Sequence, residues 1–159
     1  MSTQDVLNFY GHDHDELDDF LKKFQSLKLK EYAQARAFFR KFKFGLQRHI
    51  LWEEEILFPL FESKTGMTDS GPTAVMRQEH ILIKAALEAL HLKVQKNDPD
   101  SNKEELTLVD LLTSHNYKEE KILYPAIDKL TTAQEKAVLF NQMKELPQER
   151  YASCGCHHD

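Results

Sequence analysis

Six residues of types that bind metal ions fall on the apolar faces of four helical patterns: His14, His49, Glu53, His80, His115 and Glu119. Each occupies a position where the spacing of neighbouring apolar residues calls for a buried side chain. Burying an unpaired carboxylate is costly, and two carboxylates that face each other cost more. The pattern therefore predicts a positive charge between Glu53 and Glu119.

The same residues repeat along the chain with one offset, because 80 minus 14, 115 minus 49 and 119 minus 53 all equal 66. The repeated motif is His-x-x-x-Glu-Glu-x-Ile-Leu-aromatic-Pro, which runs from His49 to Pro59 and again from His115 to Pro125. Apolar positions repeat with the same offset, for example Leu17 and Ile83. The sequence therefore indicates two copies of a helical hairpin.

A His and a Glu four residues apart lie one helical turn apart, about 6 Å along the axis, so both can reach one metal. Four imidazoles and two carboxylates suit iron, manganese or zinc better than calcium or a thiolate-bound metal. If Glu53 and Glu119 each bridge two metals and each metal takes two His, every metal has four protein donors. A bridging oxo or hydroxo would then leave a position open for dioxygen, nitric oxide or peroxide. The alternative, a hydrogen-bonded polar network without metal, leaves the repeat and the burial cost unexplained.

Four long helices must position these residues. Apolar and ligand-type residues recur at steps of three and four over residues 14–24, 35–60, 76–94 and 108–126, as in helices packed in a bundle. No Gly or Pro separates the first two helices, and the repeat places their break at residues 31–35. Ser101 with Glu104 has the spacing of a capping box. A fifth helix is predicted from Thr132, where Glu135 completes another such box, and it carries Val138, Phe140 and Met143.

Composition is consistent with a soluble helical domain. The 159 residues are 41% hydrophobic and 30% charged, with 5 Gly and 5 Pro. A formal net charge of -5 and the absence of a basic stripe argue against nucleic acid and anionic membranes as partners. No apolar run could span a bilayer and no signal peptide is evident, so a cytoplasmic location is expected. We expect residues 1–146 to form the bundle and its C-terminal helix, and residues 147–159 a flexible tail.

The six ligand positions, with the Glu-Glu and Pro extensions, resemble those of the hemerythrin-like, or HHE, cation-binding domain over residues 13–130. The resemblance implies an all-α, up-down antiparallel four-helix bundle that holds a non-haem di-iron site at the six residues. The family's oxygen carriers have a further His four residues before that of the third helix, where this chain has Met76. The ligand set is more similar to di-iron proteins linked to repair of iron-sulfur clusters, although those generally carry an additional cysteine-containing N-terminal segment.

Other residues of types that could bind metal are expected to have different roles. His12 and His91 are expected to be solvated, and Met76 to line the metal pocket without binding the metal. Glu54 and Glu120 lie about 100° around the helix from the buried face, so a flanking role is favoured over ligation. The tail carries Cys154, Cys156, His157 and His158, which could hold zinc, copper(I) or an iron in transit, form a redox-active disulfide, or do neither.

These observations predict two non-haem irons, with manganese or a mixed pair as alternatives, and dioxygen, nitric oxide or peroxide as ligands. The function expected is binding of, or reaction with, these molecules in oxidative or nitrosative stress. Two alternatives stay open, an iron donor to an iron-sulfur client protein and an oxygen storage or sensing module. Both an enzyme and a binding protein are compatible with the sequence, and so is any oligomeric state.

Overall fold

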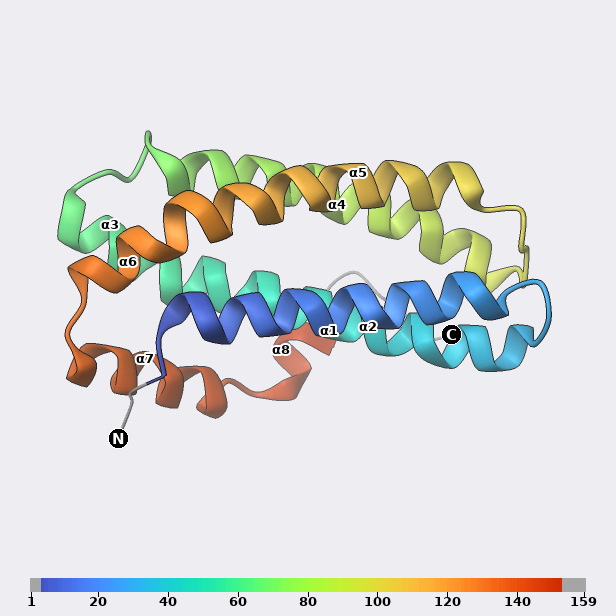
Figure 1. Cartoon of the computed structure of the whole chain (residues 1–159), viewed down its shortest axis with the longest axis horizontal. Helices are drawn as coiled ribbons and strands as arrows, with labels where there is room; N and C mark the ends of the chain where they lie inside the picture. The colour runs from blue at the N-terminus through green and yellow to red at the C-terminus, as the bar shows by residue number, and fades with distance from the viewer. Residues whose placement is uncertain (1–3, 153–159) are drawn as a thin grey trace.

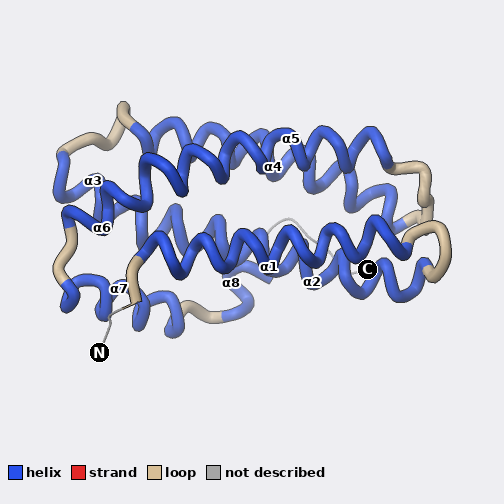
Figure 2. Tube along the Cα trace, viewed as in Figure 1, coloured by secondary structure: helices blue, strands red, loops and turns tan. Residues whose placement is uncertain are grey.

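The computed structural model describes residues 4–152, and the tail residues Cys154, Cys156, His157 and His158 lie outside this range. The described chain is helical almost throughout (Figure 2). Its elements, including two short π-helical turns labelled η, are α1 (Val6–Leu27), α2 (Tyr32–Trp52), η1 (Glu53–Leu57), α3 (Phe58–Thr65), α4 (Pro72–Gln95), α5 (Asn102–Lys118), η2 (Glu119–Leu123), α6 (Tyr124–Leu130), α7 (Ala133–Glu145) and α8 (Gln148–Ala152). Within it, no helix combines the length and the apolar character that crossing a bilayer requires.

Four long helices form an antiparallel bundle made of two hairpins. The hairpin of α1 and α2 lies against the hairpin of α4 and α5, and each long second helix continues through a π-helical turn into a short one, α3 or α6 (Figure 1). Helix α7 follows α6 and packs against η1, and α8 contacts α2. The predicted bundle with an additional C-terminal helix is therefore confirmed.

The two π-helical turns follow from the two prolines of the repeat. A proline has no backbone N–H, and its ring clashes with the carbonyl four residues earlier in an α-helix. Directly before Pro59, the N–H of Phe58 bonds to the carbonyl of Glu53, five residues back, and before Pro125 the N–H of Tyr124 bonds to that of Glu119. The wider turn absorbs one extra residue, a feature frequent at functional sites.

This extra residue corrects the predicted buried face beyond each turn. The sequence pattern continued through Ile56 and Leu60 in the first hairpin, but Leu57 and Phe61 are the buried residues, at 0% and 3% exposure. In the second hairpin Ile122 is 59% exposed, whereas Leu123 is buried. The helical period was extended through a turn that does not keep it, so every later position slipped by one.

The predicted helix ends are partly confirmed. Thr132 and Glu135 form the expected capping box at the start of α7. Ser101 does not cap α5. Its hydroxyl accepts from Nζ of Lys28 and donates to the carboxylate of Glu105. The first break lies at residues 28–31 rather than 31–35, since the connection in the first hairpin is shorter than that in the second, residues 96–101.

The buried face of α7 also differs from the expected one. Val138 is 50% exposed, and Leu139 and Met143 are the buried residues of this helix. The stretch lacks the regular spacing of the bundle helices, so its register was poorly defined by sequence.

The bundle interior consists of two apolar clusters. One contains Leu17, Leu46 and Ile83 and occupies the part of the bundle near the two hairpin connections. The other contains Tyr10, Leu57 and Leu123 and is extended by residues of α3, α6 and α7. The six predicted ligands lie between these clusters along the chain, on every one of the four long helical runs, so the fold places a polar layer between two apolar ones.

Candidate metal centre

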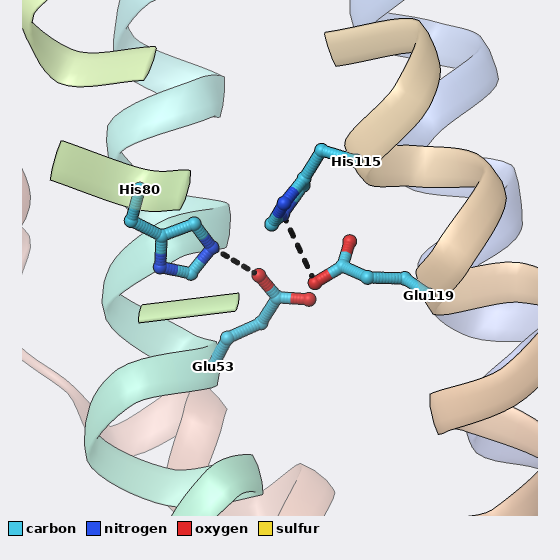
Figure 3. Close-up of side chains that lie close together, drawn as sticks. All are labelled: Glu53, His80, His115 and Glu119. Carbon is cyan, nitrogen blue, oxygen red and sulfur yellow. Dashed lines mark hydrogen bonds and ion pairs between the residues drawn. The ribbon is translucent and has the colours of Figure 1, made fainter. Parts of the chain in front are cut away.

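The fold brings all six predicted ligands together. His14 lies on α1, His49 on α2, His80 on α4 and His115 on α5, while Glu53 and Glu119 begin η1 and η2. Each is at most 3% exposed. Their ligand atoms form two groups within which all atoms lie within 4.8 Å of one another: Glu53, His80, His115 and Glu119 in one, and His14, His49 and Glu119 in the other. Figure 3 shows the four side chains of the first group pointing toward a common centre.

Each carboxylate directs one oxygen to each pair of imidazoles. Glu53 places Oε1 3.1 Å from Nε2 of His80 and Oε2 3.4 Å from Nε2 of His49. Glu119 places Oε2 3.2 Å from Nε2 of His115 and Oε1 3.1 Å from Nε2 of His14. Two positions therefore exist, one between His80 and His115 and one between His14 and His49. Glu119 belongs to the ligand groups of both positions, whereas Glu53 belongs to the first group and contacts only His49 of the second pair. The hydroxyl of Tyr124 lies 3.4 Å from Nε2 of His14 and 3.3 Å from Nε2 of His49.

Four further carboxylates hold the imidazoles from outside and are called here the outer carboxylates. Each is paired with the Nδ1 atom of one imidazole: Asp13 with His49 at 2.7 Å, Glu54 with His80 at 2.8 Å, Glu79 with His115 at 2.8 Å, and Glu120 with His14 at 2.7 Å. An Nδ1–H that donates to a carboxylate leaves the Nε2 lone pair of the neutral ring toward the centre. Metal-binding histidines in proteins are oriented in this way.

The sequence analysis gave Glu54 and Glu120 a flanking role, and the structure places them at His80 and His14. Asp13 and Glu79, the other two outer carboxylates, were not predicted. Both directly precede a predicted ligand in the sequence, and 79 minus 13 equals the repeat offset of 66. That agreement was the signal that could have identified them.

Tyr124 is a third residue of the centre that was not predicted. Its hydroxyl is hydrogen-bonded to Glu53 and lies 2.8 Å from Oε1 of Glu119. Burial raises the pKa of this hydroxyl well above its ordinary value, and the charges of Glu119 and Glu53 add to the effect, so the proton stays in place. The repeat partner is Phe58, which has no hydroxyl and stacks on His80. The difference between aromatic residues at one repeat position was the available signal.

Without a cation the neighbouring carboxylates favour the protonated forms of His49, His80 and His115, whose pKa values are all raised. Burial lowers the pKa of His80, but hydrogen bonds with Glu53 and Glu54 outweigh burial and raise it to about 9. The pKa of His49 is raised well above its ordinary value, because the charge of Glu53 and the hydrogen bond with Asp13 outweigh the same burial. Burial acts to raise the pKa of Glu53, yet the charge of His49 holds it well below its usual range. A metal would take the place of these protons.

The donors fit the predicted metals. Oε2 of Glu119 is buried, and its partner is Nε2 of His115 at 3.2 Å, too poorly aligned for a regular hydrogen bond. A buried carboxylate oxygen in this position needs a positive charge beside it, which a protonated imidazole or a metal cation can supply. Imidazole nitrogens and carboxylate oxygens form both groups, and neither contains a thiolate. This set suits iron, manganese or zinc, as the sequence predicted.

A small cavity adjoins the four imidazoles and is called here the ligand cavity. Asp18 and Asn116 are the other polar residues of its lining. The rest of the lining consists of side chains of the first apolar cluster: Leu17, Phe42, Leu46, Ile50, Ile83 and Leu112. The centre of a water-sized molecule can occupy about 10 Å³ within it, which corresponds to room for about one such molecule. Tyr124 is not part of this lining.

Three other predictions have mixed outcomes. His12 is exposed, as expected. His91 was expected at the surface, but it is 5% exposed and stacks on Phe39 with ring centroids 6.1 Å apart, because it shares the buried face of α4 with Leu87 and Val94. Met76 is buried, yet it belongs to the apolar cluster around Tyr124 rather than to the wall of the ligand cavity.

Comparison with known proteins agrees with this geometry. The family model described as the hemerythrin HHE cation binding domain matches residues 5–127, which include both π-helical turns and every residue of the two ligand groups. Neither the curated proteins nor the solved structures that were searched give a match. The match covers most of the chain, and the buried histidines and carboxylates within it form a site suited to cations. The chain therefore belongs to the hemerythrin HHE cation-binding domain family.

Proposed function

We propose that the protein holds two non-haem iron ions and binds one small molecule, dioxygen, nitric oxide or peroxide, in the ligand cavity. The observation that carries this proposal is the shared placement of the ligands. Glu53 and Glu119 each contact one imidazole of each pair, Glu119 belongs to both ligand groups, and all four imidazoles border one cavity. The four imidazoles and the two carboxylates would hold the two cations, which would supply coordination positions for a small molecule that enters the cavity.

The cavity limits what can bind. With room for about one water-sized molecule, it excludes organic substrates. Its aliphatic walls favour neutral diatomic molecules over hydrated anions, since a buried charge needs a partner. Iron and zinc can both offer an open coordination position, but only iron can also change its oxidation state.

The residues of the chain supply orientation and charge. The outer carboxylates fix the tautomer of each imidazole, so that Nε2 is available to a metal. Tyr124 holds a proton between Glu53 and Glu119, and its hydroxyl is the one hydroxyl group among the described residues that is hydrogen-bonded to these two carboxylates. The buried side chains of Leu46, Ile50 and Leu112 line the ligand cavity and keep bulk water out of it.

We place this reactivity in the response to oxidative or nitrosative stress rather than in oxygen storage. The third helix offers the metal between His80 and His115 one imidazole, and Met76 stands where the family's oxygen carriers have another. An iron ion with fewer protein ligands has more open coordination positions. We therefore expect it to react with a bound small molecule rather than to release that molecule unchanged. Donation of iron to an iron-sulfur client protein is the alternative, and it differs in requiring that iron leave the site.

The test is anaerobic purification, metal quantification, and stepwise addition of dioxygen, nitric oxide and peroxide under optical and electron paramagnetic spectroscopy. We expect two irons per chain and a spectral change with at least one of the three molecules while iron is retained. Glu53→Ala and Glu119→Ala should each reduce the iron content, whereas Glu88→Gln, outside both ligand groups, should not. A folded protein that takes up no iron would refute the proposal, and iron that leaves to an apo-cluster protein would favour the alternative.

A further inference from the structure

Two grooves open on the bundle surface where the two hairpins meet. One lies between α1 and α5, has a volume of about 300 Å³, and is called here the α1–α5 groove. The other lies between α2 and α4, has a volume of about 530 Å³, and is called here the α2–α4 groove. They differ in what separates them from the ligand cavity.

The α1–α5 groove shares a wall with the ligand cavity. Four residues line both spaces: His14, Asp18, Leu112 and Asn116. The α2–α4 groove shares only Ile50, whose side chain is 2% exposed and packed in the first apolar cluster. Exposed or half-buried polar side chains such as Asp18 and Asn116 move aside at less cost than a packed isoleucine.

The charges of the two grooves also differ. The α1–α5 groove is lined by three carboxylates, those of Asp15, Asp18 and Glu120, and no Lys or Arg is among its lining residues. The positive charge of Lys22, outside the lining, interacts with Asp18. The α2–α4 groove has one cation and one anion, Lys84 and Glu88. Carboxylates along a low-dielectric wall raise the local concentration of cations.

The floor of the α1–α5 groove carries metal-binding atoms. His14 is 3% exposed, yet it borders the groove, and its Nε2 atom lies 3.1 Å from Oε1 of Glu119 inside the centre. Glu120, whose side chain is 36% exposed, joins the groove to His14 through Nδ1. A hydrated cation could therefore exchange its water ligands stepwise for protein oxygens before it meets the first imidazole.

We propose that the α1–α5 groove is the route by which metal cations enter and leave the bundle. The proposal rests on the proposed function, because it assumes that the chain binds metal at the six residues. Divalent cations are attracted by Asp15 and Asp18 and pass between Asp18 and Asn116 to His14. The α2–α4 groove is not a route, because Ile50 closes it.

The test measures Co²⁺ uptake by the metal-free protein in a stopped-flow spectrometer, with Co²⁺ as an optical probe. Asp15→Asn and Asp18→Asn should each slow uptake about two- to fivefold at low salt, the effect of one charge several ångströms from a divalent ion, and less at physiological salt. The matched control is Glu88→Gln in the α2–α4 groove, which removes one negative charge and should leave the rate unchanged. The amount of Co²⁺ bound at equilibrium should stay constant in all three variants.

A steric pair tests the route independently of charge. Thr113→Trp fills the α1–α5 groove and should slow both Co²⁺ uptake and its removal by a chelator, whereas Ala85→Trp fills the α2–α4 groove and should change neither. Both positions are exposed, and circular dichroism checks the fold. Thr113→Phe gives a smaller plug should the Trp variant misfold.

Three results would overturn the route. Slower uptake in Ala85→Trp with normal uptake in Thr113→Trp would assign it to the other groove, and unchanged rates in both would assign it to opening of the bundle. Full Co²⁺ binding with either result leaves the proposed function standing. A parent protein that binds no Co²⁺ at the centre would overturn both proposals.

Discussion

The outer carboxylates offer a graded test of the metal centre. Asp13 and Glu120 make the same contact, a 2.7 Å pairing with Nδ1 of an imidazole, in different surroundings. The side chain of Asp13 is 10% exposed and that of Glu120 is 36% exposed. Because water weakens a charged hydrogen bond, replacing each carboxylate by its amide should cost more at Asp13 than at Glu120.

The expected size follows from the role of such partners in metal sites. Loss of an outer partner typically weakens metal binding about 10- to 100-fold, or roughly 1.4 to 2.7 kcal/mol. We expect Asp13→Asn near the upper end, since the charge is lost from a buried hydrogen bond. Glu120→Gln should lie near the lower end, because water partly replaces the carboxylate.

Isothermal titration with Co²⁺, in competition with a chelator of known affinity, measures both variants. Asp13 and Glu120 act on the position between His14 and His49, so the binding step of the other position should change little in either variant. Asp110→Asn, an exposed residue of α5 outside both ligand groups, is the matched control for the amide replacement. Equal losses of metal affinity in the two variants, or a larger loss in Glu120→Gln, would refute the inference that burial sets how strongly an outer carboxylate supports metal binding.

Other consequences concern Tyr124, pH and Met76. Tyr124→Phe leaves two buried carboxylates without their hydroxyl donor, so the metal-free protein should lose about 1 to 3 kcal/mol of unfolding free energy; thermal unfolding with and without Co²⁺ should show the larger loss without metal. Because His80 keeps its proton until its pKa of about 9, metal affinity should rise with pH up to that value, and a flat profile between about pH 6.5 and 8.5 would contradict the ring's assignment as a ligand. The same raised pKa stabilises the metal-free fold fully below about pH 6.5, and this contribution is lost as the pH rises through about 9, which denaturant titrations at several pH values would detect. Met76→His should change the optical spectrum of the iron-loaded protein and its response to oxygen, and an unchanged spectrum would show that residue 76 does not face the metals.

Much of the fold and the centre could be predicted because one physical requirement fixed both. Apolar residues at steps of three and four define a buried helical face, and charged residues on that face demand a partner. The offset of 66 then related the two hairpins, so each ligand in one hairpin supported its counterpart in the other. The positions of His49 and Glu53 followed from this pattern without knowledge of the loops.

The residues misplaced beside each π-helical turn share a cause, which is that periodicity does not report changes in helical pitch. Pro59 and Pro125 widen the preceding turn, so Leu57 and Leu123 replace Ile56 and Ile122 at the buried face. The outer carboxylates were hidden for a related reason. They lie off the apolar face, and only the three-dimensional crossing of the helices brings Glu54 to His80, 26 residues away.

The repeat makes the two proposed metal positions alike in their imidazoles, but the chain departs from the repeat around them. Tyr124 contributes a hydroxyl to both carboxylates, whereas its counterpart Phe58 stacks on His80 and contributes none. The groove that shares a wall with the cavity borders His14, whereas the groove on the opposite side is closed by Ile50. On the proposed route, a cation therefore reaches the position beside His14 first and the position beside His80 second. Two cations in nearly equal ligand sets would then exchange at different rates, so that one can stay bound while the other turns over.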